Sequence, residues 1–248
     1  MSEAENLFAD AVNEHPYDAL TPDAVLAAID SLGFYTDGRV LTLNSYENRV
    51  YQIGTEDDEP LIAKFYRPER WSREQLLEEH EFARELVGQE LPVVPPLELD
   101  GETLHEYGDF SFAVYDRKGG RAPELDNDHN LAILSRVLGR MHQVGRARPF
   151  VYRPALSVDT FGHNSVDFLL DNFIPADLAE AYDEVTCELL NRIDDLIEIK
   201  PPELIRVHGD CHIGNILWRD DAPNFVDLDD ARMAPAVQDI WMLLSGSK

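Results

Sequence analysis

The residues whose types and spacing could carry chemistry lie between positions 204 and 241. His208-Gly209-Asp210 is followed after four residues by Asn215, and a second acidic cluster begins at Asp227. Phosphoryl transfer needs a carboxylate that orients or deprotonates the attacking hydroxyl, and a hard cation that neutralises phosphate oxygens. Asp210 can provide the carboxylate, while Asn215 and Asp227 offer the oxygen ligands that magnesium prefers. The alternative interpretation is a polar loop and an acidic turn without chemistry.

A predicted β-hairpin would bring the two metal ligands together. Apolar runs at 216–218 and 224–226 flank the turn-rich residues 219–223, which is typical of two short paired strands. We expect residue 217 to face 225 and 216 to face 226, so that Asn215 faces Asp227 just beyond the paired end. Cross-strand neighbours have Cβ atoms roughly 5 Å apart, so both side chains could hold one magnesium ion. Asp210, at the exit of a strand predicted for 204–207, would lie beside them.

Two further charged residues are out of place in apolar elements. Lys64 interrupts the strand-like run LIAKFY, either as an edge-strand lysine whose amine reaches solvent or as an amine that contacts the α- and β-phosphates. Glu79 falls within the apolar arc of a helix predicted for 72–87, between Leu76 and Ala83. A solvated glutamate at the edge of the helix is the alternative. A carboxylate directed into a core needs a partner, and pairing of Glu79 with Lys64 accounts for both residues.

The order of predicted elements indicates an α+β chain with a two-lobed, protein-kinase-like fold. The first half is β-rich and the second half is helical, and the loop 116–123 with its two adjacent glycines is the expected hinge. We therefore predict a nucleotide-binding N-lobe at 1–116 and a helical C-lobe at 117–248 that carries the catalytic loop and the metal site. Helices are expected at 24–32, 72–87, 130–144, 166–173 and 176–199, and strands at 39–43, 49–53, 61–66, 97–99, 110–115 and 204–207.

Composition narrows the classes of partner. Acidic residues outnumber basic ones 48 to 21 among 248 residues, which gives a formal net charge of −27. A field of that sign argues against nucleic acid and against anionic membrane surfaces as partners. The two cysteines form no disulfide framework, and neither a signal-peptide core nor an apolar run of membrane-spanning length is present. The sequence thus predicts a soluble, cytoplasmic protein, which we expect to be a monomer.

Five motifs carry a resemblance that covers the chain from about residue 17. HGDCHIGNILWRD and FVDLDD resemble the aminoglycoside phosphotransferase and choline kinase superfamily. LNSYENRVYQ, KFYRPERW and AVQDIWML resemble the bacterial stress response kinase A family within it. The resemblance implies an ATP- and magnesium-dependent kinase of protein serine and threonine, with a role in stress response and a possible ability to phosphorylate itself.

The resemblance also implies roles for individual residues. Asp210 would be the proton acceptor, Asn215 and Asp227 the magnesium ligands, and Asp227 an active-site residue as well. Ser45 would lie at the ATP phosphates, in the loop that replaces the glycine-rich loop of other kinases. Lys64 and Glu79 match the lysine and the helix glutamate of the superfamily.

This sequence departs from the family pattern in two places. The loop around Ser45 contains no glycine, so the phosphates would have to be held by Ser45 and by backbone amides. The sequence stops at Lys248, where the family continues into more helices. We therefore expect an incomplete C-lobe with an apolar strip exposed on 166–173 and 176–199, weak transfer to an acceptor, and a tendency to associate.

Other functions compete with the kinase interpretation. FVDLD also resembles the Asp-x-Asp of haloacid-dehalogenase-type phosphatases, whose first aspartate is a nucleophile, but only 19 residues follow Asp229. His208, Asp210 and His212 have spacing compatible with a transition-metal site, although no further ligand cluster completes it. A truncated nucleotide-binding pseudokinase would bind ATP without turnover. A small-molecule kinase is the alternative among active enzymes, because an acidic cleft would suit a cationic amine or sugar.

Overall fold

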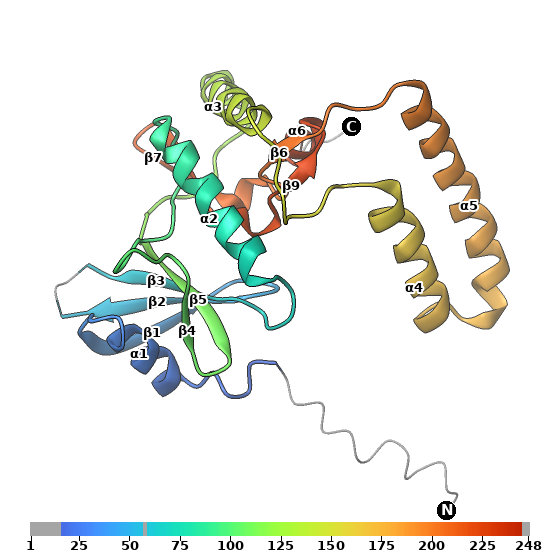
Figure 1. Ribbon diagram of the computed structural model, residues 1–248. Helices are drawn as coiled ribbons and strands as arrows, with labels where there is room; N and C mark the ends of the chain where they lie inside the picture. The colour runs from blue at the N-terminus through green and yellow to red at the C-terminus, as the bar shows by residue number, and fades with distance from the viewer. Residues whose placement is uncertain (1–15, 57–58, 245–248) are drawn as a thin grey trace, which may run out of the picture. The chain divides into compact units, whose positions relative to one another are not determined.

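The computed structural model describes residues 16–56 and 59–244, which fall into two compact units. Unit 1 takes the chain up to His80 together with Val94–Lys118, and unit 2 takes Glu81–Val93 and the chain from Gly119 onward. Helix α2 (Arg73–Gly88) contributes to both units (Figure 1). The predicted α+β class is confirmed, while the expected lobe boundary between residues 116 and 117 stays a prediction.

Unit 1 is built on a five-stranded antiparallel sheet with the strand order β1-β2-β3-β5-β4 (Figure 1). The predicted meander is confirmed, because β1 pairs with β2 and β2 pairs with β3. The register of the next pair sets Lys64 on β3 opposite Ala113 on β5. The strands are β1 (Thr36–Leu43), β2 (Arg49–Thr55), β3 (Leu61–Phe65), β4 (His105–Tyr107) and β5 (Phe110–Asp116).

The strand predicted for residues 97–99 is wrong, and the edge strand β4 was not predicted. Residues 97–99 make only single bridges, because Asp100 and Gly101 have φ values of 52° and 86° and turn the chain back immediately, so that Leu99 meets Glu102. Positive φ at two adjacent residues is the conformation of a tight two-residue hairpin turn. The partner that β5 gains is instead the three-residue β4, which is too short to show an alternating pattern.

Helix α1 (Pro22–Asp30) packs on one face of this sheet, and Leu76 of α2 packs with Ala113 on the other. Helix α1 is capped by Thr21, whose Oγ1 accepts a hydrogen bond from the Ala24 amide at 3.2 Å. Because side chains alternate along a strand, Lys64 lies on the face opposite its strand neighbours Ala63 and Phe65, which pack with α1. The α1-facing core comprises Tyr17, Leu20, Val25, Ala28, Ile29, Ile53, Leu61, Ala63, Phe65, Phe110, Phe112 and Val114.

Unit 2 contains most of the helices and two small two-stranded sheets. Strand β6 pairs with β9, and β7 pairs with β8 as a hairpin. The helix predictions for 130–144, 166–173 and 176–199 are confirmed to within two residues at each end. The elements are α3 (Asp128–Arg146), α4 (Asn164–Asn172), α5 (Ala176–Ile199), β6 (Ile205–Val207), β7 (Ile216–Arg219), β8 (Ala222–Phe225), β9 (Arg232–Ala234) and α6 (Val237–Trp241).

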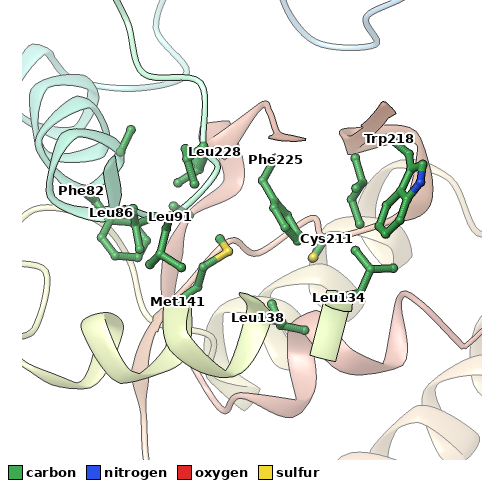
Figure 2. Packing of buried hydrophobic residues seen from close by; sticks show 14 of the residues in the cluster. Phe82, Leu86, Leu91, Leu134, Leu138, Met141, Cys211, Trp218, Phe225 and Leu228 are labelled. Atoms are coloured by element: carbon green, nitrogen blue, oxygen red, sulfur yellow. The ribbon is translucent and has the colours of Figure 1, made fainter. Parts of the chain in front are cut away.

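The main apolar core of unit 2 lies beside the predicted catalytic loop. Figure 2 shows Phe82 and Leu86 of α2, Leu138 of α3 and Phe225 of β8 contributing to it. Cys211, the residue after Asp210, is completely buried in the same core, and burial raises the pKa of its thiol. The loop that carries Asp210 is therefore attached to packed apolar structure on one side.

Helices α4 and α5 expose a strip of large apolar side chains, as the sequence predicts. No helix among the described residues is long and apolar enough to cross a bilayer. On α5 the exposed residues recur at helical spacing, whereas Leu190 is buried and lies beside Gly162 in the turn before α4. The exposed apolar residues of this helical pair are Phe168, Phe173, Leu178, Val185, Leu189, Leu196, Ile197 and Ile199.

Candidate active site

Asp210 follows β6 in a turn that brings Asn215 back to it. The Asp210 backbone oxygen accepts from the His212 amide at 2.9 Å, and a 3₁₀ turn over Ile213–Asn215 follows, capped by the ring of His212. The amide nitrogen of the Asn215 side chain donates to the backbone oxygen of Asp210 at 2.9 Å and to its Oδ2 at 3.1 Å. The four-residue spacing is thus the length of this turn. The side chain of Asp210 remains 34% exposed to solvent.

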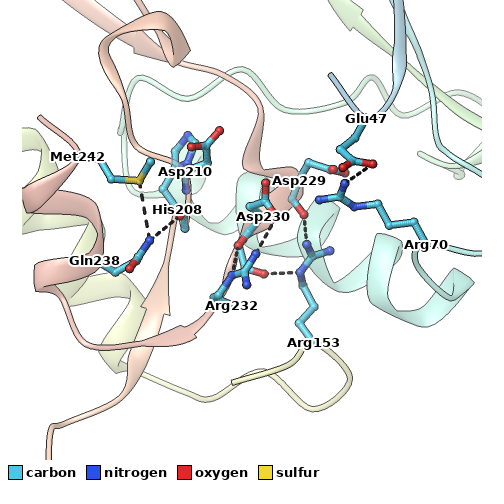
Figure 3. Close-up of polar contacts among 12 residues, drawn as sticks. Glu47, Arg70, Arg153, His208, Asp210, Asp229, Asp230, Arg232, Gln238 and Met242 are labelled. Carbon is cyan, nitrogen blue, oxygen red and sulfur yellow. Dashed lines mark hydrogen bonds and ion pairs between the residues drawn. The ribbon is translucent and has the colours of Figure 1, made fainter. Parts of the chain in front are cut away.

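A buried carboxylate on α6 holds the backbone before Asp210. Asp239 is fully buried; its Oδ2 accepts from the His208 amide at 3.0 Å and its Oδ1 from the Gly209 amide at 2.9 Å. Nε2 of His142, on α3, lies 2.9 Å from the same Oδ2. Figure 3 shows the neighbouring Gln238, whose amide nitrogen donates to the Gly209 oxygen at 3.1 Å. Both backbone amides before Asp210 are therefore fixed by one side chain.

The ring of His208 links this loop to the hairpin. Its Nε2 donates to the Val226 oxygen at 2.9 Å, and its Nδ1 accepts from the Asp210 amide at 3.4 Å. The Val226 amide in turn donates to the Asn215 oxygen at 3.0 Å. Both ring nitrogens of His208 are engaged with backbone groups, so this ring positions the loop. Among the described residues, no cluster of three His, Cys, Asp or Glu side chains is arranged to hold a metal ion.

Gly209 is required at its position by close contact and by backbone conformation. Its φ is +88°, a region that favours glycine. A Cβ atom on this residue would lie 2.0 Å from the backbone oxygen of Asp230. The Asp210 loop and the turn after Asp227 consequently lie in direct backbone contact.

The predicted register of the hairpin is wrong by one residue. Ile216 pairs with Phe225, and Arg219 pairs with Ala222, which leaves a two-residue turn. The cause is the turn itself: Asp220 and Asp221 have φ values of 52° and 57°, the conformation that closes a two-residue hairpin. The sequence interpretation assumed a longer turn.

In the observed register, Asn215 lies opposite Val226, and Asp227 is one residue further on. Asp227 has φ 62° and ψ 62° and starts a 3₁₀ turn over Leu228–Asp230. A left-handed conformation at a non-glycine residue is uncommon, although aspartate tolerates it better than most residues, and such strain often accompanies function. Asp227 therefore leaves the hairpin at a sharp bend that begins immediately beyond the Asn215 contact.

Two arginines hold the turn that follows Asp227. The buried guanidinium of Arg153 donates to the backbone oxygens of Asp229 and Ala231. Arg232 donates to the Asp230 backbone oxygen at 2.8 Å and to its Oδ1 at 2.6 Å, as Figure 3 shows. The two arginine side chains thus fix the turn after Asp227 by donating to its oxygen atoms.

Lys64 and Glu79 are both buried in unit 1, with exposures of 5% and 2%. The ammonium of Lys64 lies 5.3 Å from the centre of the Tyr66 ring, and Glu79 Oε2 lies 3.9 Å from Nε2 of His80. The Tyr66 hydroxyl is bonded to the same His80 nitrogen at 2.7 Å. This burial excludes the two alternative interpretations, a solvated edge lysine for Lys64 and a solvated helix residue for Glu79. Their mutual pairing stays a prediction.

Ser45 is half-buried in the loop between β1 and β2. The adjacent Tyr46 is 94% exposed, whereas Asn48 at the end of the loop is 2% exposed. Ser45 therefore stands between an exposed tip and an anchored base.

Sequence reasoning missed Asp239 and Arg153 as residues that support the site. Asp239 lies in the apolar stretch before Trp241, where a carboxylate on a buried helix face would have been the signal, as it was for Glu79. Arg153 gave no signal, because its partners are backbone oxygens, which any sequence supplies.

The arrangement provides the solvent-accessible carboxylates of Asp210 and Asp227 and the amide oxygen of Asn215. Both hydrogen bonds of the Asn215 side chain use its nitrogen, which leaves its oxygen for a cation. An oxygen-only set with few protein carboxylates suits magnesium, which keeps waters and phosphate oxygens as its other ligands. The oxygen atoms of these residues thus fit a magnesium ion.

Comparison with known proteins agrees with this chemistry. The family model described as "Phosphotransferase enzyme family" matches residues 39–248. Stress response kinase A of Escherichia coli strain K12 is 44% identical over 238 residues, which cover 94% of this chain and 70% of that protein. A Salmonella typhimurium protein named "Serine/threonine protein kinase RdoA" is also 44% identical, over 95% of this chain and 72% of its own length.

Solved structures show the same fold. An amicoumacin kinase, in complex with AMP-PNP, Ca²⁺ and its ligand, matches 90% of this chain and 68% of its own with a TM-score of 0.72 and 23% identity. A microcompartment-associated aminopropanol kinase matches 89% of this chain and 74% of its own with a TM-score of 0.66 and 18% identity. The predicted kinase-like fold is thus confirmed.

Proposed function

Because this chain belongs to the phosphotransferase enzyme family and groups with stress response kinase A, we propose that it transfers the γ-phosphoryl group of ATP to serine or threonine hydroxyls of proteins. The observation that carries this proposal is the Asp210 carboxylate, held by Asn215 on a loop that Asp239 fixes. The printed name of the Salmonella relative supports the protein acceptor. We also propose that the enzyme acts as a cytoplasmic monomer.

Asp210 is the base in this proposal. The acceptor hydroxyl oxygen attacks the γ-phosphorus, the bond from that phosphorus to the ADP oxygen breaks, and the hydroxyl proton passes to the Asp210 carboxylate. The hydrogen bond from Asn215 to Oδ2 fixes the rotamer of Asp210 and leaves its other oxygen for the hydroxyl. Positioning and charge stabilisation supply most of the rate in such transfers.

The remaining predicted residues bind the nucleotide. Asn215 and Asp227 would hold magnesium through oxygen atoms, and the bound ion would neutralise charge on the phosphate oxygens. Lys64 would contact the phosphates, with Glu79 orienting it, and Ser45 would donate to a phosphate from the β1–β2 loop. The assignment of the metal ligands rests on the oxygen atoms of Asn215 and Asp227. That of Lys64 and Glu79 rests on the burial of both side chains.

A small-molecule hydroxyl is the second candidate acceptor. The solved structures of similar fold include kinases of amicoumacin and of aminopropanol, and a net charge of −27 favours cationic acceptors. Chemistry at Asp210 is the same in both cases, so only the acceptor differs.

Incubation with ATP labelled at the γ-phosphate tests the proposal. Label should appear on a generic protein substrate or on the chain itself, and Asp210→Asn should abolish this transfer. Asp220→Asn is the matched control, because Asp220 lies in the exposed hairpin turn with its side chain 89% exposed and with a positive φ that asparagine tolerates. Label found only on added amines or sugar alcohols would favour the second candidate, and absence of any transfer would contradict both.

A further inference from the structure

The loop over residues 44–48 has to keep its shape without glycine. It joins β1 to β2 directly after the pair Leu43–Val50. The structure describes all five residues, and none of them has a positive φ. The loop therefore has neither a glycine nor a residue in the left-handed conformation, and its side-chain contacts with other segments are a candidate source of its shape.

Glu47 makes such contacts with the segment between β3 and α2. Its Oε2 lies 2.8 Å from Nη1 of Arg67 and 2.8 Å from Nη1 of Arg70; Figure 3 shows the pair with Arg70. The two guanidinium groups lower the pKa of Glu47, the hydrogen bond from Arg67 contributing most. The carboxylate is thus charged and doubly bound at neutral pH.

The neighbouring residue strengthens the same connection. Oδ1 of Asn48 accepts from the Arg67 backbone amide at 3.1 Å, and Asn48 is buried. The Tyr17 hydroxyl donates to the backbone oxygen of Glu47 at 2.9 Å. Arg67 lies three residues after Lys64, so these bonds tie the Ser45 loop to the end of the lysine strand.

We propose that Glu47 is a positioning residue that clamps the loop 44–48 to Arg67 and Arg70, so that Ser45 and Lys64 keep a fixed separation for the phosphates of ATP. The inference rests on the proposed function and explains how a loop without glycine holds Ser45 in place. Rigidity supplied by cross-links takes the part that glycine-rich backbone has in other kinases. The clamp also connects the segments that carry the motifs LNSYENRVYQ and KFYRPERW through side-chain contacts.

The clamp acts on the loop and contributes little to overall stability. The side chains of Glu47, Arg67 and Arg70 are 30%, 50% and 21% exposed, and exposed ion pairs stabilise folded proteins only slightly. Loss of the clamp should therefore leave the melting temperature of the chain nearly unchanged while the loop becomes mobile. That separation makes the proposal testable.

Glu47→Gln removes the charge and keeps the size of the side chain. The matched control is Asp37→Asn, which removes one negative charge from the exposed pair of Asp37 with Arg39 on β1, 2.5 Å apart. Hydrogen exchange of the amides at 44–48 in the 248-residue chain measures loop mobility without reference to activity. Initial rates at varied Mg·ATP give KM and kcat.

We expect Glu47→Gln to speed exchange at 44–48 and to raise the KM for ATP, each about fivefold, the factor that corresponds to the strongest exposed pairs. The kcat should stay within about twofold, and Asp37→Asn should change neither quantity. Unchanged exchange in Glu47→Gln would overturn the clamp, whatever the activity. Faster exchange with an unchanged KM would overturn the positioning role alone. A wild-type chain without ATP turnover would contradict the proposed function instead, and exchange would still decide whether Glu47 holds the loop.

Discussion

Replacing Asp239 by asparagine tests whether this buried carboxylate holds the Asp210 loop in place. The carboxylate is fully buried and accepts from the amides of His208 and Gly209, while the His142 ring contacts the same Oδ2. Asparagine keeps one oxygen but places an NH₂ group where a second acceptor is needed. In Asp239→Asn, at least one buried N–H group that now donates to the carboxylate would therefore face the NH₂ group, which is also a donor.

The magnitude follows from the bonds that are lost. A hydrogen bond to a charged group contributes about 1.5–3 kcal/mol. The NH₂ group of asparagine replaces either Oδ1, which has one contact, or Oδ2, which has two, and the remaining bonds lose the negative charge of their acceptor. We expect the free energy of unfolding to fall by about 3 kcal/mol. The kcat should fall about tenfold or more, because Asp210 is displaced, whereas the KM for ATP should change little.

Urea unfolding and initial-rate kinetics measure these two effects. Asp194→Asn is the matched control, since Asp194 also contacts a histidine, His163, at 3.2 Å, but with a side chain that is 49% exposed. The control should keep wild-type stability and kcat. Wild-type stability and kcat in Asp239→Asn would refute the claim that this carboxylate holds the loop.

Three other changes test separate parts of the site. Asp227→Ala should weaken Mg·ATP binding at least tenfold in calorimetry, because the metal loses its charged ligand; unchanged affinity would direct attention to another carboxylate. Gly209→Ala should lower both stability and kcat, since its Cβ would lie 2.0 Å from the Asp230 oxygen at a φ of +88°; wild-type melting and kinetics would contradict this contact. Arg206 lowers the pKa of Glu85 below its ordinary 4.5, so the pair stabilises the fold above that pH and loses its effect on acidification. Glu85→Gln should accordingly flatten the pH dependence of unfolding below about pH 5, and an unchanged slope would exclude this pair as its source.

The sequence predicted those parts of the fold that depend on periodicity and length. The helix 176–199 and the three strands of the first meander have strong patterns and were located correctly. Strand β4 has three residues and no readable alternation, so its existence depends on the partner that β5 offers. The turn at Asp100-Gly101 was predicted. That it is a two-residue turn, so that residues 97–99 do not form a strand, is visible only in the backbone angles.

The contact between Asp210 and Asn215 was predicted from their spacing, whereas the register of the hairpin was not. Asp220-Asp221 forms a two-residue turn, and the choice between turns of two and three residues moves every cross-strand pair by one. Asp239 could have been suspected from a carboxylate in an apolar helix. Arg153 could not, because backbone oxygens are acceptors wherever the chain bends, and the sequence does not show which ones converge.

The central claim is that Asp210 takes the proton from a hydroxyl while other residues bind Mg·ATP. Parallel measurement of phosphoryl transfer and of Mg·ATP affinity in Asp210→Asn tests it most directly, because a general base acts on the rate and scarcely on nucleotide binding. The account predicts a kcat at least a hundredfold lower, with an affinity within about threefold of the wild-type chain. A kcat close to the wild-type value, or a parallel loss of affinity, would contradict it.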